Sequence, residues 1–179
     1  MLGDVLETRA HTYEVVAVGG SALVLLGYVH RATRDVDLIA LVERGRLAPA
    51  SPLPAPLAEA VADVARALEL PGDWLNAGPA SALELGLPEG FVDRLESRRY
   101  GGLVLHLAGR TDLIALKLYA AVDQGPRSRH TTDLQSLAPT HAELLAAAKW
   151  TRTHDPSDGF RSQLVQALAF FGIDEHDDV

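Results

Sequence analysis

The chain contains no cysteine, one methionine and two lysines among its 179 residues. The lack of cysteine excludes disulfides, thiolate zinc sites and a cysteine nucleophile. The longest apolar stretch, residues 15–29, is shorter than the roughly 20 residues that a membrane span needs, and it contains three glycines. Residues 1–7 also lack the basic and apolar segments of a signal peptide. We therefore expect a cytoplasmic protein with no membrane role.

Acidic residues outnumber basic residues by 24 to 16, and the formal net charge is −8. This balance argues against non-specific binding of long nucleic acid, although local basic groups can still hold a nucleotide or an RNA end. Arginine supplies 14 of the 16 basic residues. The two lysines, Lys117 and Lys149, are therefore exceptions to a strong preference for arginine, and Lys117 lies within a predicted helix.

A short β-branched run, residues 15–18, ends at Gly19 and Gly20. Ser21 follows, and it is predicted to cap an apolar helix over residues 22–28. Backbone N–H groups at the start of a helix attract anions, and glycines let a ligand approach them closely. The turn therefore predicts a phosphate site, although a plain strand-to-helix turn has the same pattern.

Asp35 and Asp37 follow shortly after, at the start of a second predicted strand. Residues two apart in a strand point to the same face, so both carboxylates are expected at one place. Carboxylate oxygens suit Mg²⁺ or Mn²⁺, which keep their other positions for water and substrate phosphates. In combination with the glycine turn, these acids predict a phosphoryl- or nucleotidyl-transfer site.

This pattern resembles the DNA polymerase β-like nucleotidyltransferase superfamily, and within it the small prokaryotic branch that includes abortive-infection AbiEii-like proteins. The resemblance is carried by the Gly-Gly-Ser helix start, Gly27, Arg31, Thr33 and Asp35-Val36-Asp37. A second similar region comprises residues 112–120, with Lys117, and residues 129–134, with Asp133. Together the two regions extend over residues 14–138.

The resemblance implies an α+β fold: a polymerase β-like core with a mixed sheet, helices packed on it and a helical C-terminal part. It assigns Asp35 and Asp37 to the metal and, with Lys117, to catalysis. Nucleotide binding is assigned to the glycine turn and to three side chains further along the chain: Gly19, Gly20, Ser21, Arg31, Lys117 and Asp133. Two simpler readings stay open: Lys117 as a lysine whose amine reaches out of the core, and Asp133 as a helix cap.

The implied reaction moves a nucleoside monophosphate from a nucleoside triphosphate to a hydroxyl of RNA, such as tRNA, or of a protein. A cognate partner within a toxin–antitoxin system is also implied. Two departures favour an alternative, a non-catalytic nucleotide-binding or antitoxin-like subunit. His130 stands where the family motif has its first Asp, and His106 is the polar residue of the strand that would carry a third carboxylate.

The resemblance implies a nucleotidyltransferase-like domain over 1–138. Periodicity and turn residues predict further helices over 139–173, packed on the same domain, and an acidic tail over 174–179. A Gly-Gly turn joins two predicted hairpin strands, residues 98–100 and 103–107. Residues 44–56, with four prolines, are expected to form a loop, and residues 73–87 are expected to be irregular. Helices are expected over residues 2–12, 57–68, 111–122, 133–137, 141–153 and 158–171.

Overall fold

The computed structural model describes residues 1–125 and 127–173, which form a mixed α+β fold. The chain divides into two compact units, Met1–Ala108 and Gly109–Val179. The helices that follow the sheet pack on one another in the second unit. The sheet and the helices that cover it belong to the first unit, and the remaining helices form the second.

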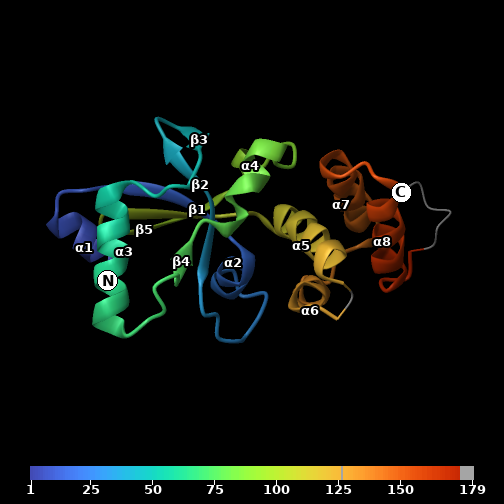
Figure 1. The fold of residues 1–179 in the computed structure, drawn as a ribbon, viewed down its shortest axis with the longest axis horizontal. Helices are drawn as coiled ribbons and strands as arrows, with labels where there is room; N and C mark the ends of the chain where they lie inside the picture. The colour runs from blue at the N-terminus through green and yellow to red at the C-terminus, as the bar shows by residue number, and fades with distance from the viewer. Residues whose placement is uncertain (126, 174–179) are drawn as a thin grey trace. The chain divides into compact units, whose positions relative to one another are not determined.

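The first unit alternates short helices with strands, as the glycine and proline punctuation of the sequence predicts (Figure 1). Its strands are β1 (Tyr13–Val18), β2 (Val36–Glu43), β3 (Arg46–Ala48), β4 (Leu75–Asn76), β5 (Glu96–Tyr100) and β6 (Leu103–Leu107). Its α-helices are α1 (Leu2–Thr8), α2 (Gly19–Leu25), α3 (Ala55–Leu68) and α4 (Ser81–Leu85), with 3₁₀ turns η1 (Gly78–Ala80) and η2 (Val92–Arg94).

The strands form one mixed sheet in the order β3-β2-β1-β6-β5, and β4 pairs with β2. The pairs β1–β6 and β2–β4 are parallel, and the other pairs are antiparallel. Val15–Val18 at the centre is buried on both sides. Along β1, Val16 lies opposite His106 and Val18 lies opposite Asp37, so these two polar residues lie on the same face of the sheet.

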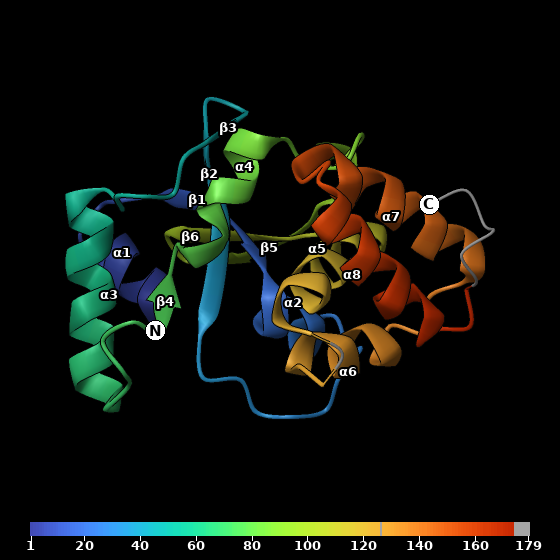
Figure 2. The same cartoon turned by 45° about the vertical axis from the view of Figure 1, so that its right-hand side comes forward.

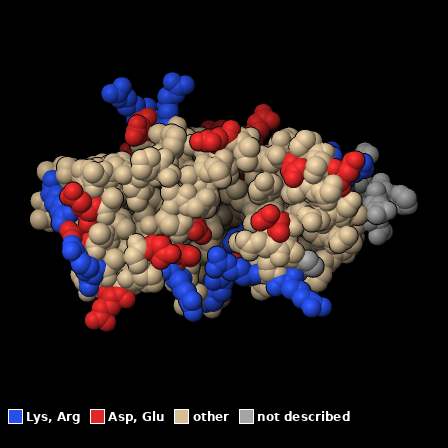
Figure 3. Space-filling model, viewed as in Figure 1, with Lys and Arg blue, Asp and Glu red and all other residues tan. Residues whose placement is uncertain are grey.

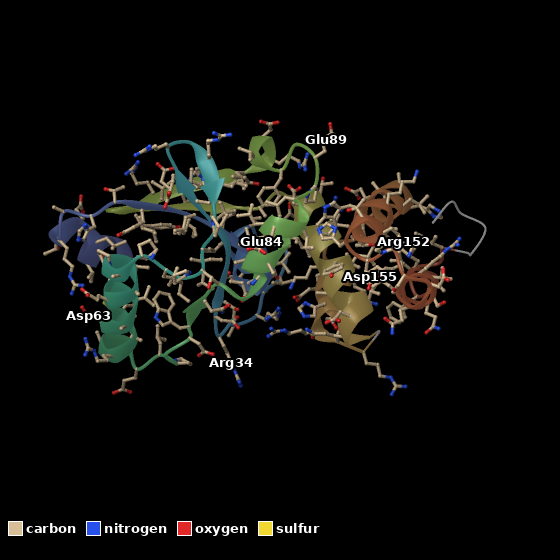
Figure 4. The ribbon with its side chains drawn as sticks, turned by 45° about the horizontal axis from the view of Figure 1, so that its top comes forward. Arg34, Asp63, Glu84, Glu89, Arg152 and Asp155 are labelled. Atoms are coloured by element: carbon tan, nitrogen blue, oxygen red, sulfur yellow. The ribbon has the colours of Figure 1, made fainter. Side chains whose placement is uncertain are left out.

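Helices α1 and α3 lie side by side in Figure 1 and Figure 2, and they contact each other. Asp63, labelled on α3 in Figure 4, forms ion pairs with Arg9, at the end of α1, and with Arg66. The N–H of Gly102 donates to the carbonyl of Gly3 over 2.9 Å, which holds α1 on the β5–β6 turn. These contacts fix the end of the sheet that lies opposite the glycine turn along β1.

The second unit consists of α5 (Arg110–Gln124), α6 (Arg129–Ser136), α7 (His141–His154) and α8 (Asp158–Ala169). A capping box between Thr140 and Glu143 begins α7. Helix α5 packs on the other three helices, and its leucines 113 and 118 are fully buried. No helix in residues 1–125 or 127–173 has the length and apolar character that a membrane span requires.

Most predicted elements are present within a few residues of their expected ends. The predicted loop over residues 44–56 is wrong at its start, because Arg44 and Gly45 adopt positive φ and turn the chain back into β3. The region 73–87, predicted to be irregular, contains β4 and α4. The acidic tail predicted over residues 174–179 lies outside the described residues.

Candidate active site

The glycine turn connects β1 to α2 directly. Gly19 has a φ of +71°, a backbone conformation that residues other than glycine rarely adopt. A β-carbon built on Gly19 would overlap the Asp37 carboxylate at Oδ2. Glycine is therefore required at position 19 for two reasons: the backbone turns sharply here, and an acidic side chain occupies the adjoining space.

Asp37 reaches the turn because β2 runs antiparallel to β1. The register places Asp37 opposite Val18, the last residue of β1. Its Oδ2 faces Gly19, and its Oδ1 accepts a hydrogen bond from the Asn76 side chain over 3.1 Å. The two carboxylate oxygens therefore have different surroundings.

Asp35 precedes β2 and is held by Thr33. The Thr33 hydroxyl lies 3.2 Å from the Asp35 carbonyl and 3.4 Å from its Oδ1. Thr33 Oγ1 also lies 3.3 Å from the place where a β-carbon on Gly20 would be. Residues of the 31–37 segment therefore lie at both glycines, and the two predicted parts of the site come together.

Two arginines flank this segment and differ in orientation. The guanidinium of Arg31 lies beside Gly20, with Nη2 3.3 Å from the position of a β-carbon there. Arg34 is exposed, and Figure 4 shows its side chain pointing away from the ribbon. No ion pair joins Arg34 to Asp35 in the described residues. Of the two arginines, Arg31 is the one that lies at the glycine turn.

Ser21 does not cap α2, which corrects the sequence-based prediction. The helix begins at Gly19, with Val18 in the N-cap position, so Ser21 lies within the first turn. Its side chain is buried, and its hydroxyl donates to the Val18 carbonyl over 3.2 Å. The difference arises because the positive φ of Gly19 lets the helix start immediately after the strand.

Asn76 is a polar residue of the site that the sequence analysis missed. It lies in β4 directly opposite Asp37. One signal was available, because Asn76 is the single asparagine of the chain and follows the apolar Trp74-Leu75 pair. Asn76 and Asp37 are 39 residues apart, so local sequence patterns could not predict their contact.

A divalent cation is compatible with these residues, by the chemistry of the donors. Asp35 and Asp37 offer carboxylate oxygens, which hard cations such as Mg²⁺ prefer. No group of three or more His, Cys, Asp or Glu side chains with metal-binding geometry occurs in the part of the chain that the structure describes. Two carboxylates suit Mg²⁺, which usually retains waters and binds substrate phosphates.

His106 does not supply a third metal ligand. Its Nδ1 lies 2.7 Å from Ser97 Oγ on β5, and its Nε2 lies 3.0 Å from Glu14 Oε2 on β1. The side chain is 14% exposed. Both ring nitrogens are engaged by neighbouring side chains, and these contacts tie three strands together.

Lys117 and Asp133 form a buried ion pair in the second unit. Lys117 Nζ lies 2.7 Å from Asp133 Oδ2, and the side chains are 6% and 3% exposed. The amine therefore does not reach out of the core. Asp133 lies inside α6, whose N-cap is Ser128, so the helix-cap reading of Asp133 is wrong. The pair connects α5 to α6.

His130, on the same helix, is kept neutral by its surroundings. Burial, and then the positive charge of Lys117, lower the pKa of His130 from 6.5 to about 4. Arg129 lowers this pKa further, while Asp133 and Asp123 oppose the shift. Nδ1 of His130 is buried and has no hydrogen-bond partner in the described part of the chain.

This environment predicts a specific pH dependence of stability. Between pH 6.5 and about 4, the unfolded chain binds a proton at His130 that the folded chain excludes. Stability from this group is therefore complete above pH 6.5 and decreases as the pH falls. Urea denaturation at pH 7 and pH 5 should show a larger loss of stability for the wild type than for His130→Gln. Equal losses in both proteins would contradict this assignment.

Charged side chains of both signs occur on the face shown in Figure 3. This distribution agrees with the net charge of −8.

One comparison with known proteins gives a match. A family model described as "Nucleotidyltransferase of unknown function (DUF6036)" matches residues 3–136. The matched region contains the glycine turn, both acids of the 31–37 segment, Lys117 and Asp133. No curated protein and no solved structure matches the chain.

Proposed function

Because the chain belongs to this family of nucleotidyltransferases of unknown function, we propose that it transfers a nucleoside monophosphate from a nucleoside triphosphate to a hydroxyl. In this reaction the hydroxyl oxygen loses its proton to solvent and bonds to the α-phosphorus. The bond from the α-phosphorus to the oxygen that bridges to the β-phosphate breaks, and pyrophosphate leaves. The observation that carries the proposal is the position of Asp37 against Gly19, with Thr33 and Arg31 beside Gly20.

Each residue at the turn has a distinct task in this proposal. Asp35 and Asp37 would hold Mg²⁺ or Mn²⁺, which neutralises charge on the phosphates and activates the attacking hydroxyl. Gly19 and Gly20 would present backbone N–H groups to the phosphates. Arg31, beside Gly20, would add positive charge there. Thr33 would keep Asp35 in place.

The buried Ser21 hydroxyl is directed at a backbone carbonyl, so its part in nucleotide binding would be to shape the turn. Lys117 and Asp133 would act as a pair that holds α5 on α6, because both charges are buried and satisfied by each other. Either RNA ends, including tRNA, or a protein hydroxyl would serve as acceptor. A toxin–antitoxin partner belongs to the same proposal and rests on the family resemblance.

Transfer of label tests this function. Purified protein would be incubated with each α-³²P-labelled nucleoside triphosphate, Mg²⁺ or Mn²⁺, and total bacterial RNA or protein. We expect label on a macromolecule with the wild type. Asp35→Asn/Asp37→Asn should reduce transfer at least about 100-fold, because the metal-binding carboxylates are lost. Asp73→Asn is the matched control, since this exposed aspartate precedes β4 and should leave transfer unchanged.

The same experiment distinguishes the proposed transfer reaction from the alternative function. A wild-type protein that binds nucleotide in calorimetry but transfers no label would be a non-catalytic nucleotide-binding subunit. The missing third carboxylate among the described residues is the observation that favours this alternative. Absence of both binding and transfer would contradict both functions.

A further inference from the structure

Asn76 is placed opposite Asp37 by two short strands. The parallel pairing of β2 with β4 aligns Val36 with Leu75 and Asp37 with Asn76. The N–H of Val36 donates to the Trp74 carbonyl over 2.6 Å, which adds a backbone contact just before this pair. The side chains of Asp37 and Asn76 are therefore neighbours on adjacent strands.

The segment that carries Asn76 is firmly attached. The Trp74 indole N–H donates to the Val61 carbonyl of α3 over 3.1 Å. Leu75, the next residue, is buried. The pairing of β4 with β2 positions Asn76 itself, and the contact with α3 anchors the chain two residues earlier.

The orientation of the Asn76 amide follows from its second contact. The N–H of Gly78 points at the Asn76 side chain, with 2.8 Å between Gly78 N and Asn76 Oδ1. A backbone N–H can only donate, so the amide oxygen must face Gly78. The amide nitrogen is then left to donate to Asp37 Oδ1, over 3.1 Å.

This donor engages one oxygen of the Asp37 carboxylate. With Oδ1 held by the Asn76 amide, the other oxygen, Oδ2, is directed toward Gly19. Groups that hold a ligand carboxylate in this way orient it for a metal, and their removal typically costs affinity or activity. The glycine turn and Asn76 contact opposite oxygens of one carboxylate.

We propose that Asn76 is a positioning residue that holds Asp37 with Oδ2 turned to the glycine turn, where the metal and the phosphates would bind. The effect of Asn76 on catalysis rests on the proposed function, whereas its effect on the orientation of Asp37 does not. Asn76 belongs to neither motif that carries the family resemblance, and its position gives β4 a role in the site.

The test compares Asn76→Leu with Trp74→Phe. Leucine has nearly the shape of asparagine but cannot donate to Asp37, whereas Trp74→Phe removes the contact of the same segment with α3 and leaves the Asn76 amide in place. Crystal structures would show the Asp37 side chain, calorimetry with Mn²⁺ alone would give metal affinity, and label transfer would give kcat and KM.

For Asn76→Leu we expect the Asp37 carboxylate to leave its contact with Gly19. Mn²⁺ affinity should fall about tenfold or more and kcat about 10- to 100-fold, with KM for the nucleotide nearly unchanged. Trp74→Phe should keep the Asp37 contact and should change kcat less than about threefold, since the donor to Asp37 is retained. A merely structural role of Asn76 would not separate kcat from KM in this way.

The inference is overturned if Asp37 keeps its contact with Gly19 in Asn76→Leu, or if the two variants have equal Mn²⁺ affinity. Failure of the proposed function is a different result: the wild type would transfer no label. In that case the crystal structure of Asn76→Leu still decides whether Asn76 orients Asp37, because that readout requires neither metal nor activity.

Discussion

Replacement of Lys117 by methionine is expected to lower the free energy of unfolding by about 3–5 kcal/mol. Methionine matches the length of lysine but removes the cation that lies 2.7 Å from the buried Asp133 carboxylate. Removal of one partner from a buried ion pair is strongly destabilising because the buried charge loses that attraction. The double variant Lys117→Met/Asp133→Leu should recover most of the loss, because it removes both buried charges.

Tryptophan fluorescence can follow the unfolding of each unit separately, since Trp74 lies in the first unit and Trp150 in the second. In a Trp74→Phe background, urea denaturation followed at Trp150 reports on the second unit. Lys149→Met is the matched control, because Lys149 is the other lysine and is exposed on α7. This control should change stability by less than about 0.5 kcal/mol. Equal stability of the two lysine variants would contradict the buried pair.

The double variant also tests the catalytic role predicted for Lys117. If Lys117 serves only to join α5 to α6, the refolded double variant should retain label transfer. If the amine contacts nucleotide phosphate, transfer should be lost although the protein remains folded. Stability and transfer therefore separate the two interpretations of this lysine.

Gly19→Ala is expected to reduce label transfer about 100-fold or more, because small displacements of reacting groups have effects of this size. The substitution forces alanine into a φ of +71° and drives a β-carbon into the Asp37 carboxylate. The backbone conformation alone costs about 1–2 kcal/mol. The displacement of Asp37 then removes the carboxylate from the turn.

Gly45→Ala is the control for backbone strain, since Gly45 has a φ of +75° and a β-carbon there meets nothing within 4 Å. Both variants should lose a similar amount of stability from the backbone, measured by urea denaturation. Only Gly19→Ala should lose label transfer and Mn²⁺ affinity. Retention of both by a folded Gly19→Ala protein would contradict the proposed site.

The main secondary structure could be predicted from the sequence because it depends on local patterns. The β-branched run before Gly19 predicted β1, and the Gly-Gly turn at 101 and 102 predicted the β5–β6 hairpin. The short β4 could not be predicted in this way. A two-residue strand has no periodicity, and it forms only because β2 offers an unpaired edge.

The glycine turn, the acidic 35–37 segment and the order of helices and strands could be predicted from residue type and spacing, and the α+β fold from the family resemblance. Which side chains meet depends on tertiary packing. The Asn76 amide contacts Asp37, His106 contacts Glu14 and Ser97, and Lys117 pairs with Asp133. These partners are far apart along the chain or on different elements, so strand register and helix packing, and not local pattern, bring them together.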